Sequence, residues 1–130
     1  VIGVVQGDIH DLGKSVVVAM LLAAGFEVID LGVDVSTSGF VQAVINHRPD
    51  ILGIGAYLST TMNEMRDVIA ALNAAGLRSS VKVMIGGVPT TQGFADGIGV
   101  DAWGPDAATT VTKALRLVRA EGGARSRQDS

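Results

Sequence analysis

Residues 1–15, VIGVVQGDIHDLGKS, carry the clearest indication of the fold. Their first five residues form an apolar, β-branched run that is typical of a strand buried on both faces. A polar loop follows, and from Gly13 onward apolar residues recur at the spacing of a helix. A buried strand that leads through a loop into a helix is typical of parallel α/β sheets.

The same alternation continues along the chain. We predict further strands at residues 27–31, 51–56, 81–85 and 102–103, and helices at residues 13–24, 38–47, 61–75, 91–98 and 106–120. Gly25 and Gly76 are expected to act as helix C-caps. The pattern predicts an α/β domain with a five-stranded, doubly wound parallel sheet in the flavodoxin-like order, where ligands bind beyond the carboxyl ends of the strands.

The composition excludes several classes of protein. Hydrophobic residues make up 48% of the 130 residues and charged residues 18%, which excludes an intrinsically disordered chain. A net charge of −3 and an aromatic content of 4% argue against a nucleic-acid partner. The longest apolar run, residues 16–26, is too short to span a membrane, and the absence of cysteine excludes disulfides and thiolate metal sites. We expect a cytoplasmic protein with no membrane partner.

Three loops gather polar groups where such a sheet would bind a ligand. They are residues 6–15 with Asp8, His10 and Asp11, residues 55–62 with Ser59, Thr60 and Thr61, and residues 86–89 with Gly86 and Gly87. Because these loops follow neighbouring strands, we expect them to line one crevice. Each also has a structural interpretation: the acidic and hydroxyl side chains suit helix N-termini, the glycine pair suits a tight turn, and a loop histidine is commonly just hydrogen-bonded.

His10 and Asp8 together suggest a metal ligand. An imidazole can bind a metal through one nitrogen while the other donates to a carboxylate, which raises the basicity of the ligand. The sequence lacks the further ligands that zinc requires, so one histidine suffices only for a metal already held by a macrocycle. The loop also lacks the glycine spacing of the common phosphate-binding motifs.

These residues resemble the cobalamin-binding domain of corrinoid-dependent methyltransferase systems, the type found in methionine synthase. Residues 7–14, GDIHDLGK, match the signature G-D-x-H-D-x-G-K, and residues 59–62 match the end of S-x-L-x-T-T-T-M. Residues 85–92, IGGVPTTQ, and 99–107, GVDAWGPDA, resemble I-G-G-A-P-V-T-Q and G-A-D-x-Y-A-P-D-A. The resemblance covers nearly the whole chain.

The resemblance implies a cobalamin cofactor in the base-off/His-on state, with His10 as the lower axial ligand of cobalt. Asp8 would accept the second ring proton of His10, Thr61 would complete a proton relay, and these three would be the catalytic residues. The implied cofactor-binding residues are Asp8, Ile9, His10, Asp11, Leu12, Gly13, Tyr57, Leu58, Ser59, Thr61, Gly86, Gly87 and Val88. Gly55 and Tyr57 depart from the serine and leucine of the family, which puts one hydrogen bond to the nucleotide tail in doubt.

The resemblance also implies a domain organisation and a function. Residues 1–120 would form the cobalamin-binding domain and residues 121–130 a flexible tail, with the family's N-terminal helical cap absent. The domain would carry methyl groups between substrate-side and acceptor-side methyltransferases, served by a reductive activase, as a component and not a stand-alone enzyme. A cobalamin-dependent sensor or storage module is the alternative. Leu12 and Lys14 argue against a radical mutase, and Gly55, Ala56 and Tyr57 against a phosphorylated receiver domain.

Overall fold

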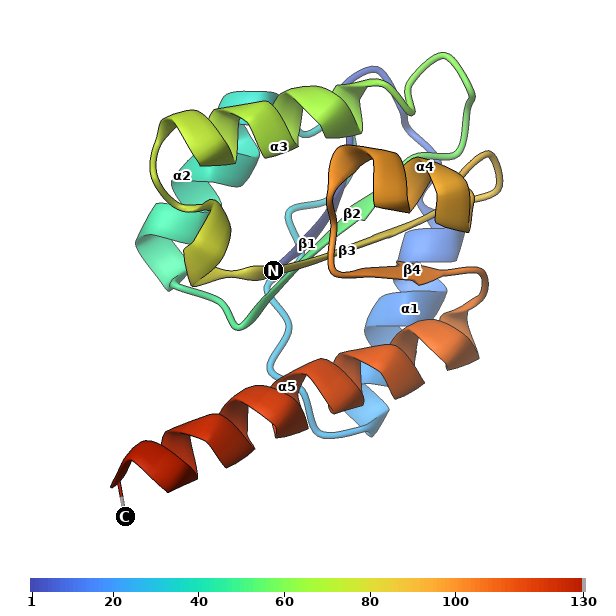
Figure 1. Ribbon diagram of the computed structural model, residues 1–130. Helices are drawn as coiled ribbons and strands as arrows, with labels where there is room; N and C mark the ends of the chain where they lie inside the picture. Colours follow the sequence, from blue (N-terminus) through green and yellow to red (C-terminus); the bar gives the residue numbers. More distant parts are fainter. Residues whose placement is uncertain (130) are drawn as a thin grey trace.

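The sheet has four parallel strands in the order β1-β2-β3-β4. The computed structural model describes residues 1–129, with side chains for residues 1–119. The elements are β1 (Ile2–Val4), α1 (Leu12–Ala23), α2 (Thr37–His47), β2 (Ile51–Gly55), α3 (Glu64–Ala74), the 3-10 helix η1 (Arg78–Ser80), β3 (Lys82–Gly86), α4 (Gln92–Ile98), β4 (Ala102–Gly104) and α5 (Ala107–Asp129). Helices α2 and α3 pack together on one face of the sheet and α1 and α5 on the other (Figure 1). The doubly wound α/β prediction is therefore confirmed.

The core lies mainly between the sheet and the α2/α3 layer. Phe40 of α2, Leu52 of β2, and Met65 and Leu72 of α3 are fully buried there. Burying a side chain of this size stabilises the fold by about 1.5–3 kcal/mol. The opposite face of the sheet carries several glycines beside Ile2 and Met84, and a cavity lies between this face and helices α1 and α5.

The prediction of a regular strand at residues 27–31 is wrong. Residues 29–35, here called the edge segment, lie beside β1 but form only isolated bridges, Ile2 to Asp30 and Val5 to Val35. Gly32 and Asp34 have positive φ values of 85° and 54°, which interrupt the extended conformation. The Asp30 carboxylate also accepts the Gly32 N–H at 2.8 Å. The segment occupies the place of the fifth strand in the flavodoxin-like order without completing the ladder.

The helix predicted from residue 61 begins instead at Glu64, after a series of turns. The side chain of Asn63, at the N-cap, makes no capping hydrogen bond, and Thr61 is turned toward the loop after β1. Gly25 and Gly76 each lie one residue beyond the C-cap with positive φ, the usual place of glycine after a helix.

The last helix, α5, extends to Asp129. The side chains from residue 120 onward lie outside the described part, so the domain boundary at 120 and the flexible tail at 121–130 stay predictions. No helix within residues 1–129 combines the length and the apolar character that crossing a membrane requires.

Candidate functional site

The loop after β1 holds an exposed imidazole against a buried carboxylate. His10 Nδ1 lies 2.7 Å from Asp8 Oδ1, and the side chain of His10 is 53% exposed while that of Asp8 is 0% exposed. An Nδ1–H that donates to Asp8 leaves the Nε2 lone pair free to bind a metal. Neither Asp8 nor Asp11 caps helix α1, although their positions allow it. Asp11 is the N-cap residue, but its side chain accepts no capping hydrogen bond, and Asp8 accepts the backbone N–H of His10 instead.

Asp8 joins the loop after β1 to the loop after β2. Its Oδ2 accepts hydrogen bonds from the Tyr57 N–H at 2.7 Å and from the Thr61 hydroxyl at 2.8 Å. Burial alone would raise the pKa of the Asp8 carboxyl, but the hydrogen bonds from Tyr57, His10 and Thr61 outweigh burial and lower the pKa to about 2. Asp8 is thus a fixed carboxylate near neutral pH, and two of the three predicted loops do converge.

Replacement Asp8→Asn is expected to change the acid stability of the chain. The folded pKa of Asp8, about 2, lies below its ordinary value of 3.8, so its stabilising contribution is present above pH 3.8 and is lost as the pH falls toward 2. This contribution is about 2 kcal/mol at neutral pH. Urea unfolding of both proteins at a series of pH values measures it: their difference in unfolding free energy should shrink between about pH 4 and pH 2. A difference that stays constant down to pH 2 would contradict the assignment.

A cavity of about 330 Å³, here called the slot, lies between the sheet and helices α1 and α5. Gly55, Gly86 and Gly104 stand in register on three adjacent strands and contribute no side chains to the sheet surface that lines it. Val16 and Val17 of α1 and Ala107 of α5 line the opposite side. A row of glycines in neighbouring strands is typical of a site where a ligand approaches the backbone closely.

The loop after β3 closes one end of the slot. Gly87 has a φ of 122°, a conformation that favours glycine, and a Cβ on it would lie 1.8 Å from the Ala56 carbonyl oxygen. The buried hydroxyl of Thr90 donates to the Gly87 carbonyl oxygen at 2.5 Å and accepts a hydrogen bond from Trp103 Nε1 at 2.9 Å. The glycine pair is a tight turn, and it also borders the slot.

Large apolar side chains are exposed on the loops around His10. Ile9 comes from the loop after β1, Leu12 from the start of α1, Leu58 from the loop after β2 and Val88 from the loop after β3, and each is at least 40% exposed. Because parallel strands end at one edge of a sheet, these side chains share that edge. Such an edge suits a flat, largely apolar ligand.

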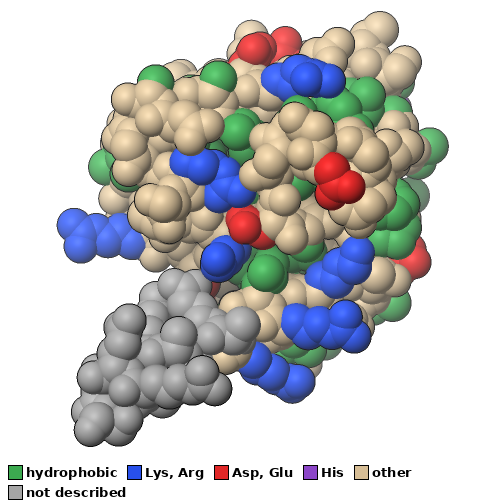
Figure 2. Space-filling view, in the orientation of Figure 1, with side chains coloured by type: hydrophobic (Ala, Val, Ile, Leu, Met, Phe, Trp, Pro, Cys, Tyr) green, Lys and Arg blue, Asp and Glu red, His purple; other side chains and the backbone are tan. Residues whose placement is uncertain are grey.

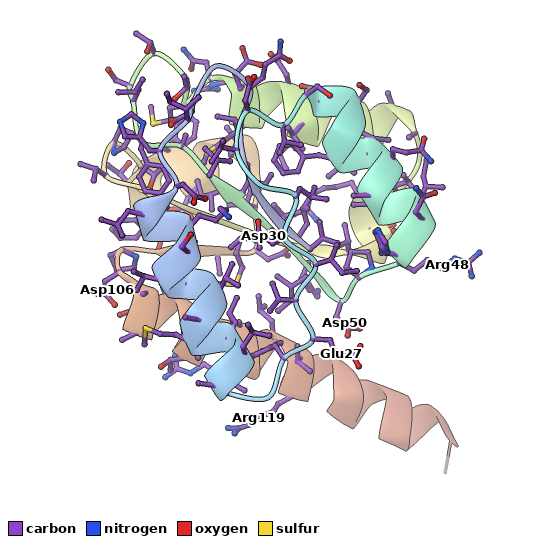
Figure 3. All side chains as sticks on the ribbon, turned by 180° about the vertical axis from the view of Figure 1, so that it is seen from behind. Glu27, Asp30, Arg48, Asp50, Asp106 and Arg119 are labelled. Carbon is purple, nitrogen blue, oxygen red and sulfur yellow. The ribbon has the colours of Figure 1, made fainter. Side chains whose placement is uncertain are left out.

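Lys14 is a buried residue to which the sequence analysis gave no role in the site. It is only 4% exposed, and its Nζ lies 2.6 Å and 2.8 Å from the two carboxylate oxygens of Asp30 and 2.9 Å from Asp11. Asp34 accepts the Gly7 N–H at 2.7 Å and donates its own N–H to the Asp8 carbonyl oxygen. The edge segment, on which Figure 3 labels Asp30, thus holds both ends of the His10 loop. The signal for this role in the sequence was a lysine at the third position of α1, among apolar residues.

Replacement Lys14→Met is expected to lower the free energy of unfolding by about 1–3 kcal/mol, because it removes a buried ammonium from two carboxylates. The loss stays moderate since Asp30 and Asp11 are partly exposed and water can solvate them. Lys113→Met is the matched control, because Lys113 donates to the Trp103 carbonyl oxygen and lies over the Trp103 ring, away from the His10 loop. Urea unfolding should show that Lys14→Met is less stable than Lys113→Met, and equal stabilities would contradict a stabilising role for the pairing of Lys14 with Asp30 and Asp11.

The structure brings together most of the predicted site residues. Asp8, His10 and Thr61 are joined by hydrogen bonds, and Gly13, Tyr57, Gly86, Gly87 and Val88 line the slot. Ser59 is exposed and lies outside the slot, and Asp11 pairs with Lys14. Gly104, Asp106 and Thr110 also line the slot, although only the motif at residues 99–107 pointed to that loop. Within the described residues no group of three or more His, Cys, Asp or Glu side chains could hold a metal ion.

The residues away from this edge differ in character. Figure 2, in the orientation of Figure 1, shows lysine and arginine side chains beside α5 and no histidine on that face. At the edge itself, Asp106, labelled in Figure 3, follows β4 and caps α5 by accepting the Thr109 N–H at 2.7 Å. The chemistry of the site is therefore concentrated at the carboxyl ends of the strands.

Comparison with known proteins gives consistent matches. The family model for the B12 binding domain matches residues 1–124. Dimethylamine corrinoid protein 3 of Methanosarcina mazei is 48% identical over 116 residues, which cover 89% of this chain and 70% of that protein. Trimethylamine corrinoid protein 2 of Methanosarcina acetivorans is 44% identical over 119 residues, covering 92% of this chain and 55% of that protein.

Two solved structures are similar over the same region. The monomethylamine corrinoid protein of Methanosarcina barkeri superposes with a TM-score of 0.86 at 38% identity, covering 89% of this chain and 56% of that one. The methanol:cobalamin methyltransferase complex MtaBC from Methanosarcina barkeri gives 0.85 at 31% identity, with 91% and 45% covered. The chain thus spans about half the length of most of these proteins.

Proposed function

The chain belongs to the B12-binding domain family, and we propose that it is a methyl-carrier domain that accepts a methyl group from one methyltransferase and passes it to another. Cobalamin binding follows from the family. The observation that carries the rest of the proposal is the exposed imidazole of His10, held by a carboxylate that is itself bound to Thr61 and Tyr57.

The residues present suit the base-off/His-on form of this cofactor. His10 Nε2 would bind the metal, and the slot beside the glycine row would receive the displaced nucleotide tail. Side chains larger than glycine would not fit this row unchanged, because an added Cβ would lie 3.1 Å from the Gly104 carbonyl oxygen at position 86 and 1.8 Å from the Thr110 hydroxyl at position 104. When bound, the corrin-held cobalt supplies the centre that carries the methyl group.

The chain's own residues hold a proton at Nδ1 of His10. The Asp8 carboxylate lies 2.7 Å from Nδ1, so it orients the imidazole and would stabilise positive charge on it. Because hydrogen bonds hold the pKa of the Asp8 carboxyl at about 2, Asp8 stays a carboxylate that can accept the hydrogen bond from His10. Thr61 donates its hydroxyl hydrogen to Asp8 Oδ2 and so keeps the carboxylate oriented.

The proposed partners are a substrate-side methyltransferase, an acceptor-side methyltransferase and a reductive activase, in the cytoplasm. Relatives named as dimethylamine and trimethylamine corrinoid proteins, and the methanol:cobalamin methyltransferase complex, support a methyltransferase partner. The net charge of −3 and the low aromatic content argue against a nucleic-acid partner, and no helix within residues 1–129 could span a membrane.

The test starts from the purified chain mixed with hydroxocobalamin, desalted, and examined by visible absorption spectroscopy. We expect retained corrinoid with the spectrum of histidine coordination. Addition of a purified methyltransferase and its methyl donor should then convert the bound corrinoid to its methylated form. Failure to retain corrinoid would overturn the proposal, and retention without methylation by any such partner would favour the sensor or storage alternative.

A further inference from the structure

Tyr57, the one tyrosine of the sequence, lines the slot. Its backbone N–H donates to Asp8, which fixes the backbone at this position, and its ring packs against Gly13 and Gly55. The Tyr57 hydroxyl lies 2.6 Å from the point that a Cβ on Gly13 would occupy and 3.7 Å from the corresponding point on Gly55. The ring is therefore packed into space that only glycine at position 13 leaves free.

The Tyr57 hydroxyl makes no hydrogen bond to any other described side chain or backbone group within residues 1–119. Its surroundings in the slot are mostly glycine and aliphatic side chains, such as Val16 and Ile54. A half-buried phenol usually finds a polar partner, so a free hydroxyl beside a cavity is suited to a ligand atom. Burial raises the pKa of Tyr57, and the charge of Asp8 adds to this effect, so the phenol keeps its proton and can donate.

We propose that the Tyr57 hydroxyl donates a hydrogen bond to an acceptor atom of the corrinoid's nucleotide tail, and so makes Tyr57 a specificity-determining residue for tailed over tailless corrinoids. This inference rests on the proposed function, because it needs a corrinoid whose tail enters the slot. The donor is positioned by the packing of the Tyr57 ring against Gly55 and Gly13.

Gly55 and Tyr57, the two departures from the family pattern, lie in contact with each other. A Cβ on Gly55 would lie 3.4 Å from the Tyr57 ring, so a serine hydroxyl at position 55 and the ring at position 57 would address the same part of the slot. Gly55 leaves room for the ring, and the phenol then provides the hydroxyl that glycine cannot. A hydrogen-bond donor is thus kept in the slot although the serine is absent.

The experiment compares two probes, hydroxocobalamin and diaquacobinamide, which lacks the nucleotide tail. Equilibrium dialysis of the full chain with each probe gives two dissociation constants. Tyr57→Phe keeps the ring and removes only the hydroxyl, so cobalamin should bind about three- to tenfold more weakly, whereas the constant for cobinamide should change less than about twofold. Thr112→Val is the control, since it removes a hydroxyl on α5 that bonds only to the Ala108 carbonyl oxygen, outside the slot.

Rescue provides a second readout that mere loss of packing would not give. Tyr57→Leu should lose the preference for cobalamin, and Gly55→Ser with Tyr57→Leu should regain it, because the serine hydroxyl returns to the same region of the slot. Failure of the double variant to regain the preference would overturn the role of the hydroxyl.

The outcomes separate this inference from the proposed function. If the unaltered chain binds both probes and Tyr57→Phe weakens both equally, or neither, the specificity role is overturned and the carrier proposal stands. If the unaltered chain binds neither probe, the proposed function fails and this inference fails with it. Selective weakening of cobalamin alone supports the assignment.

Discussion

Replacement His10→Ala is expected to abolish the His-on absorption spectrum of the chain loaded with cobalamin. His10 provides the one imidazole at the edge where the loops converge, and no group of three or more metal-ligating side chains exists in the described part to take its place. The variant should still fold, because the His10 side chain is 53% exposed and Asp8 keeps its bonds to Tyr57, Thr61 and the backbone N–H of residue 10. Visible spectroscopy after desalting measures the result.

Two further variants make this result specific. His47→Ala removes the other histidine, which lies at the end of α2, and should leave the spectrum unchanged. Asp8→Asn keeps the imidazole but weakens its hydrogen-bonded partner, so the same spectrum should persist with coordination weakened about 10–100-fold. An unchanged spectrum in His10→Ala would refute axial ligation by this residue. Loss of the His-on spectrum in His47→Ala would instead identify His47 as the metal ligand.

The convergence of the loops was predictable from the sequence because it depends on topology. Strands at residues 1–5 and 51–56 read as buried and parallel, so their carboxyl ends had to share one edge of the sheet. The contacts of Asp8 with Tyr57 and Thr61, about 50 residues away along the chain, follow from that arrangement. The predicted topology therefore sufficed to bring the loops that carry Asp8, His10 and Thr61 to one edge, but it did not specify which side chains bond to each other.

Features decided by tertiary contacts were not predictable in the same way. Residues 27–31 have the composition of a strand, but the turns at Gly32 and Asp34 and the pairing of Asp30 with Lys14 divert the edge segment from a regular ladder. The start of α3 moved from 61 to Glu64 because Thr61 bonds to Asp8, a partner that no local pattern reveals. The role of Lys14 was missed for the same reason.

The glycines of the slot are visible in the sequence, but their common role is not. Gly55, Gly86 and Gly104 are spread over 50 residues, and only the strand register aligns them in one row. Single glycines in strands are compatible with bulges, weak strands or ligand approach. The register between β2, β3 and β4 aligns the three glycines along the slot, which is the arrangement expected for ligand approach.

Replacement Gly87→Ala is expected to lower both the stability of the chain and its affinity for cobalamin. The φ of 122° is open to glycine and strained for alanine, and the added Cβ would lie 1.8 Å from the Ala56 carbonyl oxygen and 2.8 Å from its carbon. These contacts are with backbone, so either the turn at Gly87 or the end of β2 must move. We expect the free energy of unfolding to fall by about 2–4 kcal/mol.

The same displacement would act on ligand binding, because Ala56 lies between Gly55 of the slot and Tyr57, whose N–H holds Asp8. A shift of Ala56 would narrow the slot and loosen the carboxylate behind His10 together, so affinity for cobalamin should fall by at least about tenfold. Gly97→Ala is the matched control: Gly97 lies in α4 with no atom within 4 Å of an added Cβ, so stability should stay equal or rise by up to about 1 kcal/mol. Urea unfolding and equilibrium dialysis measure both quantities. Unchanged stability and binding in Gly87→Ala would show that the turn relaxes freely, and the slot would then not depend on a fixed backbone at Gly87.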